Sequence, residues 1–346
     1  MPAHAQETPP QFADVAARAA AARDAQNLPL AIDLYKQADQ LNPEWAEGWW
    51  YLGQLGYDAN QYATAIDAFN HLVQLNPKAA PAFALRGLCE YETGAYDDAL
   101  RDLDLAVAHG AANDPQNAAI LRFHLAQLLT HASRFQEALD QYKYFATHNL
   151  NNPDLMVAIG LAGLRMPSFL QDVPEKNRAL LQAAGEAGYR LLADDSMKAD
   201  SLFQDLFAAN PTTPGLHYFY GVLLFAHAPD LAATEFRKEL DLAPDNVDDR
   251  AMLAFSLMVG GQFRQALPEA EAAYKAAPDM EMAQLALGRS LAETGDTARA
   301  ATLLQAVLKK DPQNLEAHLG MVAVYSHMGR REDADRERAL CLGLHS

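Results

Sequence analysis

A fixed step of 34 residues recurs along this chain and restricts the folds that are open to it. Ala31, Ala65 and Ala99 are 34 residues apart, and so are Pro43 and Pro77. The same step returns in the C-terminal part, at Ala266, Ala300 and Ala334. Self-similarity at a period of this length is typical of a solenoid, in which one small structural unit is stacked on the next.

Each period reads as two helices joined by a short turn. Apolar residues at 49, 52, 55 and 56, and again at 65, 66, 69, 72 and 73, fall on one face of a helix. Between such helices lie polar turns such as "DANQY", "ETGAY", "VGGQF" and "HMGRR". The second helix ends in "LNP", "LAP" or "KDP", where proline stops it. No period-two alternation is present, so we predict an all-α fold of antiparallel helix pairs.

Small residues mark where the two helices of a unit approach most closely. We expect Gly53, Gly87, Gly221 and Gly288 on the first helices, and the recurring alanines on the second helices, to permit this approach. Bulky residues such as Phe69 and Phe236 then fill the gap to the next unit. Because one helix pair cannot bury such a face alone, stacking of units is expected to stabilise the array.

These positions together resemble the tetratricopeptide repeat. The motif is Trp49-x2-Leu52-Gly53, then Ala65-x3-Phe69, then a proline at 77, and the resemblance runs from about residue 12 to the end. One departure is that the family's tyrosine falls on a glycine, with Tyr57 beside it. The resemblance implies a right-handed α-solenoid, whose first helices line a concave groove.

The period slips once by a large amount, and this sets the predicted domain organisation. Ala138 and Ala199 are 61 residues apart, and between them lies "PSFLQDVP", whose two prolines leave little room for a full second helix. We expect a truncated or kinked unit there, either a hinge (166–174) or a static, degenerate repeat. The predicted regions are a disordered tail (1–11), an N-terminal block (12–152), irregular units (153–213) and a C-terminal block closed by a charged capping helix (214–346).

Charge and composition narrow the classes of partner. Acidic residues outnumber basic ones 45 to 27, which gives a formal net charge of −18. Such a chain repels phosphate backbones and anionic membrane surfaces, so nucleic acid is not expected as a partner. Membrane insertion is not expected either, because no run of eighteen apolar residues could span a bilayer. Two cysteines exclude a disulfide framework. Ala3-His4-Ala5 has the form left by signal cleavage, so an exported protein without its leader and a cytoplasmic protein with a proline-rich tail both stay open.

Motifs for catalysis, cofactors and metals were sought and none is found. The chain has no His-Glu-x-x-His, no glycine-rich phosphate loop and no Cys-x-x-Cys. His124 and His131 share a predicted first helix but have no third ligand in register. Cys89 is expected to be a core residue. We therefore predict no enzymatic activity, no cofactor and no metal site.

Residues spaced 3, 4 and 3 apart on the first helices should face the groove, because this spacing keeps them on one helical face. Most are apolar or aromatic, which suits a protein or peptide segment with hydrophobic anchors and basic flanks. The predicted peptide-binding residues are Trp50, Gln54, Tyr57, Leu88, Tyr91, Phe123, Gln127, Tyr218, Phe225, Phe255 and Met258.

Two functions follow from this reasoning. The first is a non-catalytic scaffold that binds a peptide or protein segment in the apolar, aromatic groove. The alternative is self-association, in which the aromatic residues form the interface of a homodimer or of an assembly platform. Trp50 is the residue on which both hypotheses are best tested, since Trp49 fills the packing position of the motif.

Overall fold

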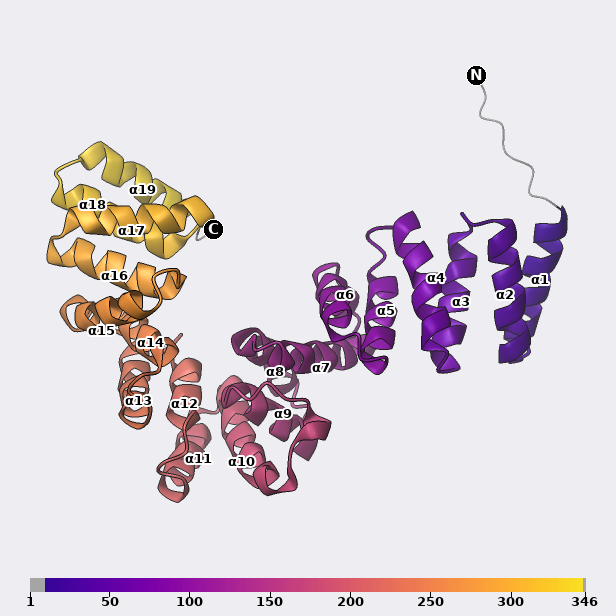
Figure 1. Cartoon of the computed structure of the whole chain (residues 1–346), viewed down its shortest axis with the longest axis horizontal. Coiled ribbons are helices and arrows are strands. Elements are labelled where there is room, and N and C mark those ends of the chain that lie inside the picture. The colour runs from indigo at the N-terminus through magenta and orange to yellow at the C-terminus, as the bar shows by residue number, and fades with distance from the viewer. Residues whose placement is uncertain (1–9, 345–346) are drawn as a thin grey trace. The chain divides into compact units, whose positions relative to one another are not determined.

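The computed structural model describes residues 10–344. Within this range the chain forms nineteen α-helices and two short 3-10 helices, and no strand (Figure 1). Within each of the two compact units described below, consecutive helices pack as antiparallel pairs and neighbouring pairs stack on one another, so the fold is an all-α solenoid as predicted. Apart from its last two residues, the predicted tail 1–11 lies outside the described residues.

The helices divide into two compact units. Unit 1 contains the chain up to Asn151 together with Met166–Val173, and unit 2 contains Asn152–Arg165 and the chain from Pro174 onward. The four regions predicted from the sequence stay a prediction, because this division follows contacts and not repeat boundaries. Because the second helix of the fifth pair is missing, one short segment of the chain belongs to unit 1 although its neighbours on both sides belong to unit 2.

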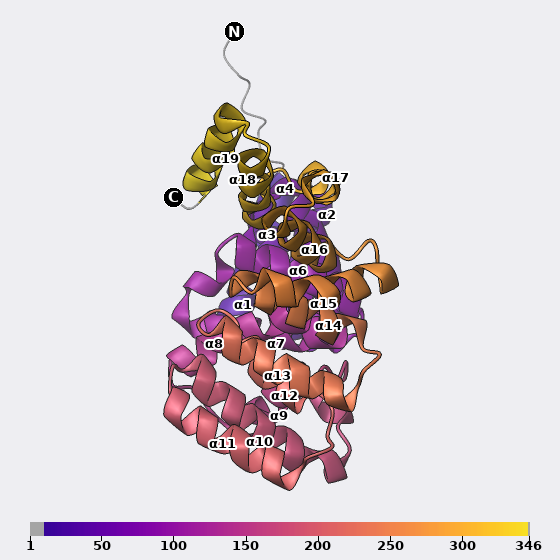
Figure 2. The same cartoon turned by 90° about the vertical axis from the view of Figure 1, so that its left-hand side faces the viewer.

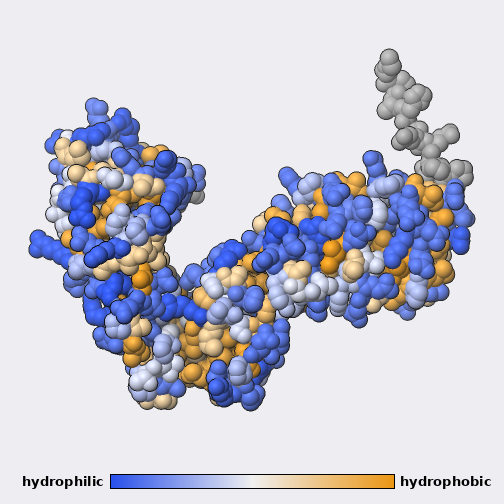
Figure 3. All heavy atoms as spheres, viewed as in Figure 1, coloured by the Kyte–Doolittle hydropathy of each residue, from blue (hydrophilic) through white to orange (hydrophobic). Residues whose placement is uncertain are grey.

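Unit 1 consists of four stacked helix pairs, which follow one another in chain order (Figure 1). Its hydrophilic surface is interrupted by apolar patches over α1–α4 (Figure 3). The elements are α1 (Pro10–Asp24), α2 (Leu28–Leu41), α3 (Ala46–Asp58), α4 (Tyr62–Leu75), α5 (Ala80–Glu92), α6 (Tyr96–Ala108), η1 (Ala111–Asn113), α7 (Pro115–His131), α8 (Phe135–Thr147) and η2 (Leu170–Asp172).

Unit 2 begins with a helix that has no second helix of its own and continues as regular pairs (Figure 2). The elements are α9 (Pro153–Gly163), α10 (Glu175–Leu192), α11 (Ser196–Ala209), α12 (Leu216–Leu224), α13 (Pro229–Leu242), α14 (Val247–Val259), α15 (Phe263–Ala276), α16 (Glu281–Thr294), α17 (Thr297–Lys310), α18 (Leu315–His327) and α19 (Arg331–Leu344).

The small residues lie at the closest helix–helix approaches, as predicted. A Cβ atom added to Gly53 would lie 2.5 Å from the ring of Phe69, and one added to Gly288 would lie 2.9 Å from Leu304. The recurring alanines of the second helices have no exposed surface at 65, 99, 138, 266 and 300, and 1% at 334. Substituting larger residues at these positions would force the two helices of a pair apart.

A hydrogen bond that was not predicted from the sequence recurs between neighbouring helix pairs. The residue sixteen positions before the small alanine donates to the carbonyl oxygen of the proline that ends the preceding helix. The side chain differs from unit to unit while the acceptor stays the same. The pairs are Trp49–Pro43 (2.8 Å), Arg250–Pro244 (2.6 Å), Gln284–Pro278 (2.6 Å) and His318–Pro312 (3.0 Å).

The break after α9 is where one second helix is missing. Arg165 has a φ of +54°, in the left-handed region that also ends the first helices of regular units at Asn60 and Gly94. A short segment, Met166–Val173, then follows in place of the second helix, and we call it the strap. Because no second helix intervenes, α9 packs directly against α10: a Cβ on Gly185 would lie 1.7 Å from the carbonyl oxygen of Met156.

Candidate peptide-binding groove

A hollow of about 530 Å³ lies in unit 1 on the first helices of three successive pairs. Trp50, Gln54 and Tyr57 of α3 line one side of it. Residues 80–88 of α5 form its floor, and the α6–α7 connection with the first turns of α7 forms the other side. Four predicted residues meet here, because Leu88 lines the hollow together with the three residues of α3.

The spacing of the helix residues explains why these side chains converge. Trp50, Gln54 and Tyr57 are 4 and 3 residues apart and so lie on one face of α3. On α5, the positions 81, 84 and 88 are spaced in the same helical pattern. Their side chains are shorter than those of α3, which leaves room above α5. Small side chains on the middle helix between larger ones on its neighbours thus produce the hollow.

The two neighbouring tryptophans have different surroundings. Trp49 is 8% exposed, stacks on His71 and donates to a backbone carbonyl group, so it is committed to the core. Trp50 is half-buried, with its ring 6.0 Å from that of Phe69, and it presents its outer surface to the hollow. A half-buried tryptophan beside an apolar hollow is the type of residue that dominates binding energy in protein interfaces.

Acidic groups lie around the hollow. Asp114 lines it and at the same time caps α7, accepting a hydrogen bond from the backbone N–H of Gln116 (3.0 Å). Glu47 is exposed one turn before Trp50 on α3. Burial raises the pKa of the Tyr57 phenol, so it stays neutral and can donate a hydrogen bond at physiological pH. The rim of the hollow is therefore negative and its wall is neutral and apolar.

The predicted residue Tyr91 lies one turn beyond Leu88 on α5, where the surface is covered by the strap. Phe169 of the strap packs against the rings of Tyr91 (5.8 Å between centroids), Tyr96 (4.4 Å) and His131 (4.3 Å). Burial raises the pKa of Tyr91, and the neighbouring Tyr96 adds to this effect. We call Tyr91, Tyr96, His124 and His131 the ring cluster.

Two other predicted residues of unit 1 face the protein and not the hollow. Phe123 packs edge-on against Phe145 of the neighbouring helix α8, with 6.2 Å between centroids. Gln127 is only 7% exposed, and its side-chain oxygen has no hydrogen-bond partner among the described residues. These contacts place both side chains in the packing between helices.

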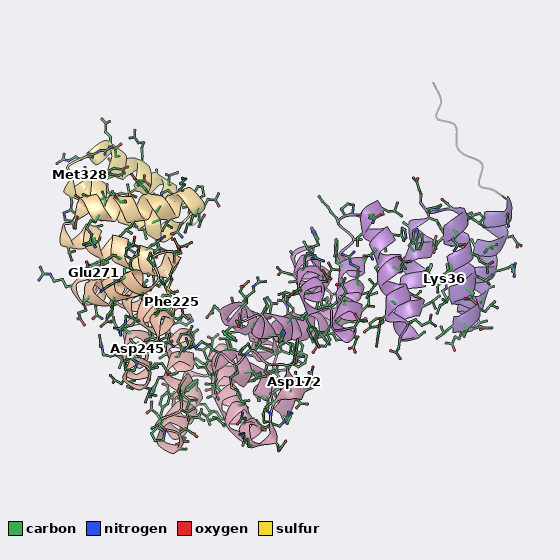
Figure 4. All side chains as sticks on the ribbon, viewed as in Figure 1. Lys36, Asp172, Phe225, Asp245, Glu271 and Met328 are labelled. Atoms are coloured by element: carbon green, nitrogen blue, oxygen red, sulfur yellow. The ribbon has the colours of Figure 1, made fainter. Side chains whose placement is uncertain are left out.

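The four predicted residues of unit 2 belong to one hydrophobic cluster. Tyr218 lies under the guanidinium group of Arg165, 3.7 Å from its ring centre. Phe225, at the C-terminal end of α12 (labelled in Figure 4), packs 5.7 Å from Phe255 and both are half-buried. Met258 has no exposed surface. Its assignment to the binding surface is therefore corrected: it is a core residue of α14, in a buried cluster with side chains of α13 and α15.

The titratable groups singled out from the sequence have structural contacts. Burial raises the pKa of Cys89 to about 12, which leaves an unreactive thiol. His124 bonds to the carbonyl oxygen of Ile120 (2.8 Å), and its ring lies 4.9 Å from that of Tyr91.

Within the described part of the chain no three His, Cys, Asp or Glu side chains gather in a way that could hold a metal ion. None of the described helices is long and apolar enough to cross a membrane.

The sequence analysis missed the strap and its binding partners in unit 1. The stretch "PSFLQDVP" was interpreted as a break and not as a segment that packs against Tyr91, Tyr96 and His131. A signal was present, since Phe169 is the one aromatic residue between two prolines. Tyr96 was also missed, because it lies at the first position of a second helix, outside the spacing used for the first helices.

Comparison with known proteins gives one family and several structures. The profile of the tetratricopeptide repeat family matches residues 16–80, 57–118 and 252–315. The solved structure of MamA AMB-1 is 20% identical over 47% of this chain and 97% of that chain, with a TM-score of 0.39. The P58(IPK) TPR domain is 14% identical over 96% and 92% (TM-score 0.32). The APC/C hetero-tetramer Cut9–Hcn1 is 15% identical over 97% and 66% (TM-score 0.38). A search of the curated proteins gives no match.

Proposed function

Because the chain is a tetratricopeptide repeat protein, we propose that it is a non-catalytic scaffold that binds a peptide or protein segment in the hollow of unit 1. The observation that carries the proposal is the convergence of Trp50, Tyr57 and Leu88 on one hollow of about 530 Å³. This volume lies within the range that binding pockets usually have, roughly 300–1,000 Å³, and it accommodates one or two large side chains of a partner.

The chemistry of the lining supports a particular class of ligand. An apolar wall formed by a tryptophan, a tyrosine and leucines gains most from burying aliphatic or aromatic side chains. The acidic rim, with Asp114 and Glu47, favours basic residues beside these anchors, and the formal net charge of −18 acts in the same direction at longer range. The partner is therefore a segment with apolar anchors and basic flanks.

A non-catalytic role fits the contacts of the polar side chains near the hollow. Asp114 caps a helix, and the thiol of Cys89 is fully buried with a raised pKa. Catalysis would require a base within reach of a nucleophile and a means to orient it. The described groups around the hollow are used for capping and packing.

The experiment compares Trp50→Ala with a matched control. Peptides selected from a displayed library on the wild-type chain are titrated against both variants by fluorescence anisotropy. We expect Trp50→Ala to weaken binding at least about tenfold, because a buried aromatic anchor contributes more than about 1.4 kcal/mol. Tyr144→Ala, which removes a half-buried ring on α8 outside the hollow, should bind like the wild type. Equal binding by the wild type and Trp50→Ala would reject the hollow as the site.

The same pair of variants tests self-association. Light scattering over a range of protein concentrations reports the molar mass of each chain. If the mass rises with concentration and Trp50→Ala prevents the rise, the hollow is an interface between copies of the chain. A constant mass for wild type and variant leaves the peptide-binding role.

A further inference from the structure

The strap covers part of the surface whose remaining part is the open hollow. Leu88 lines the hollow, and Tyr91 follows one turn later on the same helix, under the strap. On α7, Ile120 lines the hollow, and His124, one turn later, contacts Tyr91 at 4.9 Å between ring centroids. The α5–α7 surface is therefore continuous, with one half open and the other half occupied by the chain's own segment.

Phe169 is held in this surface as a single deep anchor. It is 3% exposed although it comes from a short segment whose regular structure is limited to the three-residue 3-10 helix η2. His131 stacks on one side of it, with 18° between the ring planes, and Tyr91 meets it edge-on at 90°. Offset stacking and edge-to-face contacts are the arrangements that aromatic rings prefer. Tyr91, Tyr96 and His131 thus form a pocket that an aromatic side chain occupies.

The rest of the strap has the properties of a bound peptide. Its turn is closed by its own backbone, with Ser168 donating to Met166 (2.8 Å) and Asp172 donating to Phe169 (3.1 Å). Pro167 fixes the backbone just before the anchor. Asp172, labelled in Figure 4, is exposed in the second half of the strap. The strap therefore presents an anchor from a preformed turn, which is how short segments bind helical grooves at low entropic cost.

We propose that the strap is a built-in ligand of unit 1, and that the scaffold's partner carries an aromatic anchor that replaces Phe169 in the ring cluster. This inference rests on the proposed peptide-binding role of the same surface and names the chemistry of its ligand. The partner's anchor enters the pocket between Tyr91, Tyr96 and His131, and the segment next to the anchor extends into the open hollow. Phe169 returns to the pocket when the partner leaves.

The covalent connection explains why the pocket is filled in the isolated chain. A ligand on a short tether is present at an effective concentration in the millimolar range, so even a weak anchor occupies its site. An external segment must compete with this local concentration. Contacts in the open hollow supply the additional binding energy, and they make the exchange selective for partners that engage both halves.

The test uses a fluorescent peptide with the sequence of residues 164–175 (LRMPSFLQDVPE) and the full-length chain. In the Phe169→Ala chain the pocket is vacant, so the peptide should bind at least about tenfold more tightly than to the wild type, where the tethered ring competes. A second peptide with alanine in place of its phenylalanine should bind neither chain. If Phe169→Ala fails to bind the first peptide, or binds both peptides alike, the pocket is not a ligand site.

A second variant covers the case in which Phe169→Ala disturbs folding, which circular dichroism would reveal. Pro167→Gly keeps the anchor but loosens the preformed turn, so the peptide should again bind more tightly than to the wild type. Binding equal to the wild type by a folded Pro167→Gly chain contradicts the proposal.

Trp50→Ala separates this inference from the proposed function. Trp50 lines the hollow and does not contact the ring cluster, so its removal should leave binding of the 164–175 peptide to the Phe169→Ala chain unchanged. If Trp50→Ala loses binding of the library peptides and the Phe169→Ala chain does not bind the 164–175 peptide, the hollow is the binding site and the Phe169 pocket is not. Binding to the ring cluster, with library peptides insensitive to Trp50→Ala, would place the ligand in the Phe169 pocket alone.

Discussion

Gly185→Ala tests the direct contact between α9 and α10 that replaces the missing second helix. A Cβ at position 185 would lie 1.7 Å from the carbonyl oxygen of Met156 and 2.6 Å from its carbonyl carbon. The facing residue is also a glycine, Gly160, whose added Cβ would lie 2.1 Å from the carbonyl oxygen of Leu181. Ordinary contacts of a Cβ begin near 3.4 Å, so the two helices would have to separate by more than an ångström.

The expected cost follows from these distances. Overpacking costs about 1–3 kcal/mol, and we expect the upper end because the obstructing atoms are backbone atoms that no rotamer change can move. Alanine restores about 1 kcal/mol of helix propensity relative to glycine. The net loss of stability is therefore about 2 kcal/mol. It should be local, since stability in repeat arrays is a sum over units and their interfaces.

Hydrogen exchange followed by mass spectrometry measures this local effect. A loss of about 2 kcal/mol should make amide exchange in α9 and α10 about thirtyfold faster, with α16–α19 unchanged. The matched control is Gly343→Ala in α19, where an added Cβ would have nothing within 4 Å, and its exchange rates should equal those of the wild type or fall slightly. Wild-type exchange rates in α9 and α10 of Gly185→Ala would refute the close contact.

The remaining predictions concern buried charges in unit 1. Asp39 is fully buried without a hydrogen-bond partner among the described residues, and burial raises its pKa to about 8. Because the native pKa lies above the unfolded value of about 4, ionisation destabilises the fold increasingly as the pH rises from about 4 to about 8. Asp39→Asn should therefore raise the melting temperature at pH 8 and hardly at pH 4; equal gains at both would contradict this assignment. Arg86 donates to buried Asp102 (2.9 Å) and to Asn70 (2.7 Å), so Arg86→Ala should cost about 3–5 kcal/mol in urea unfolding. The double variant Arg86→Met/Asp102→Leu should recover most of that loss, and a double variant as unstable as Arg86→Ala would argue against an unpaired buried carboxylate as the cause.

The repeat architecture was predictable because the fold depends on positions that recur. The small alanines and the glycines at close approaches repeat at a fixed step, and a periodic signal survives exceptions such as the glycine in place of the family's tyrosine. The face of α3 was predictable for the same reason, since Trp50, Gln54 and Tyr57 follow helical spacing.

The strap could not be predicted, because its contacts do not follow the repeat. Phe169 reaches Tyr96 and His131 through a segment with no helical spacing, and no local rule states which distant surface a lone aromatic residue will cover. Met258 was misplaced for a related reason. Its spacing puts it on the inner face of α14, but whether that face is open depends on how α13 packs over it.

The path of the strap also affects the folding of unit 1 during synthesis and the choice of boundaries for truncated fragments. A fragment that ends at residue 151 has every α-helix of unit 1 and still lacks Phe169, so it would expose the rings of Tyr91, Tyr96 and His131 to water. On the ribosome, unit 1 stays in that state until α9 and then the strap have emerged. Expression of the N-terminal helices alone should therefore yield an aggregation-prone fragment. A fragment that ends after residue 173 would include the strap and keep these rings covered.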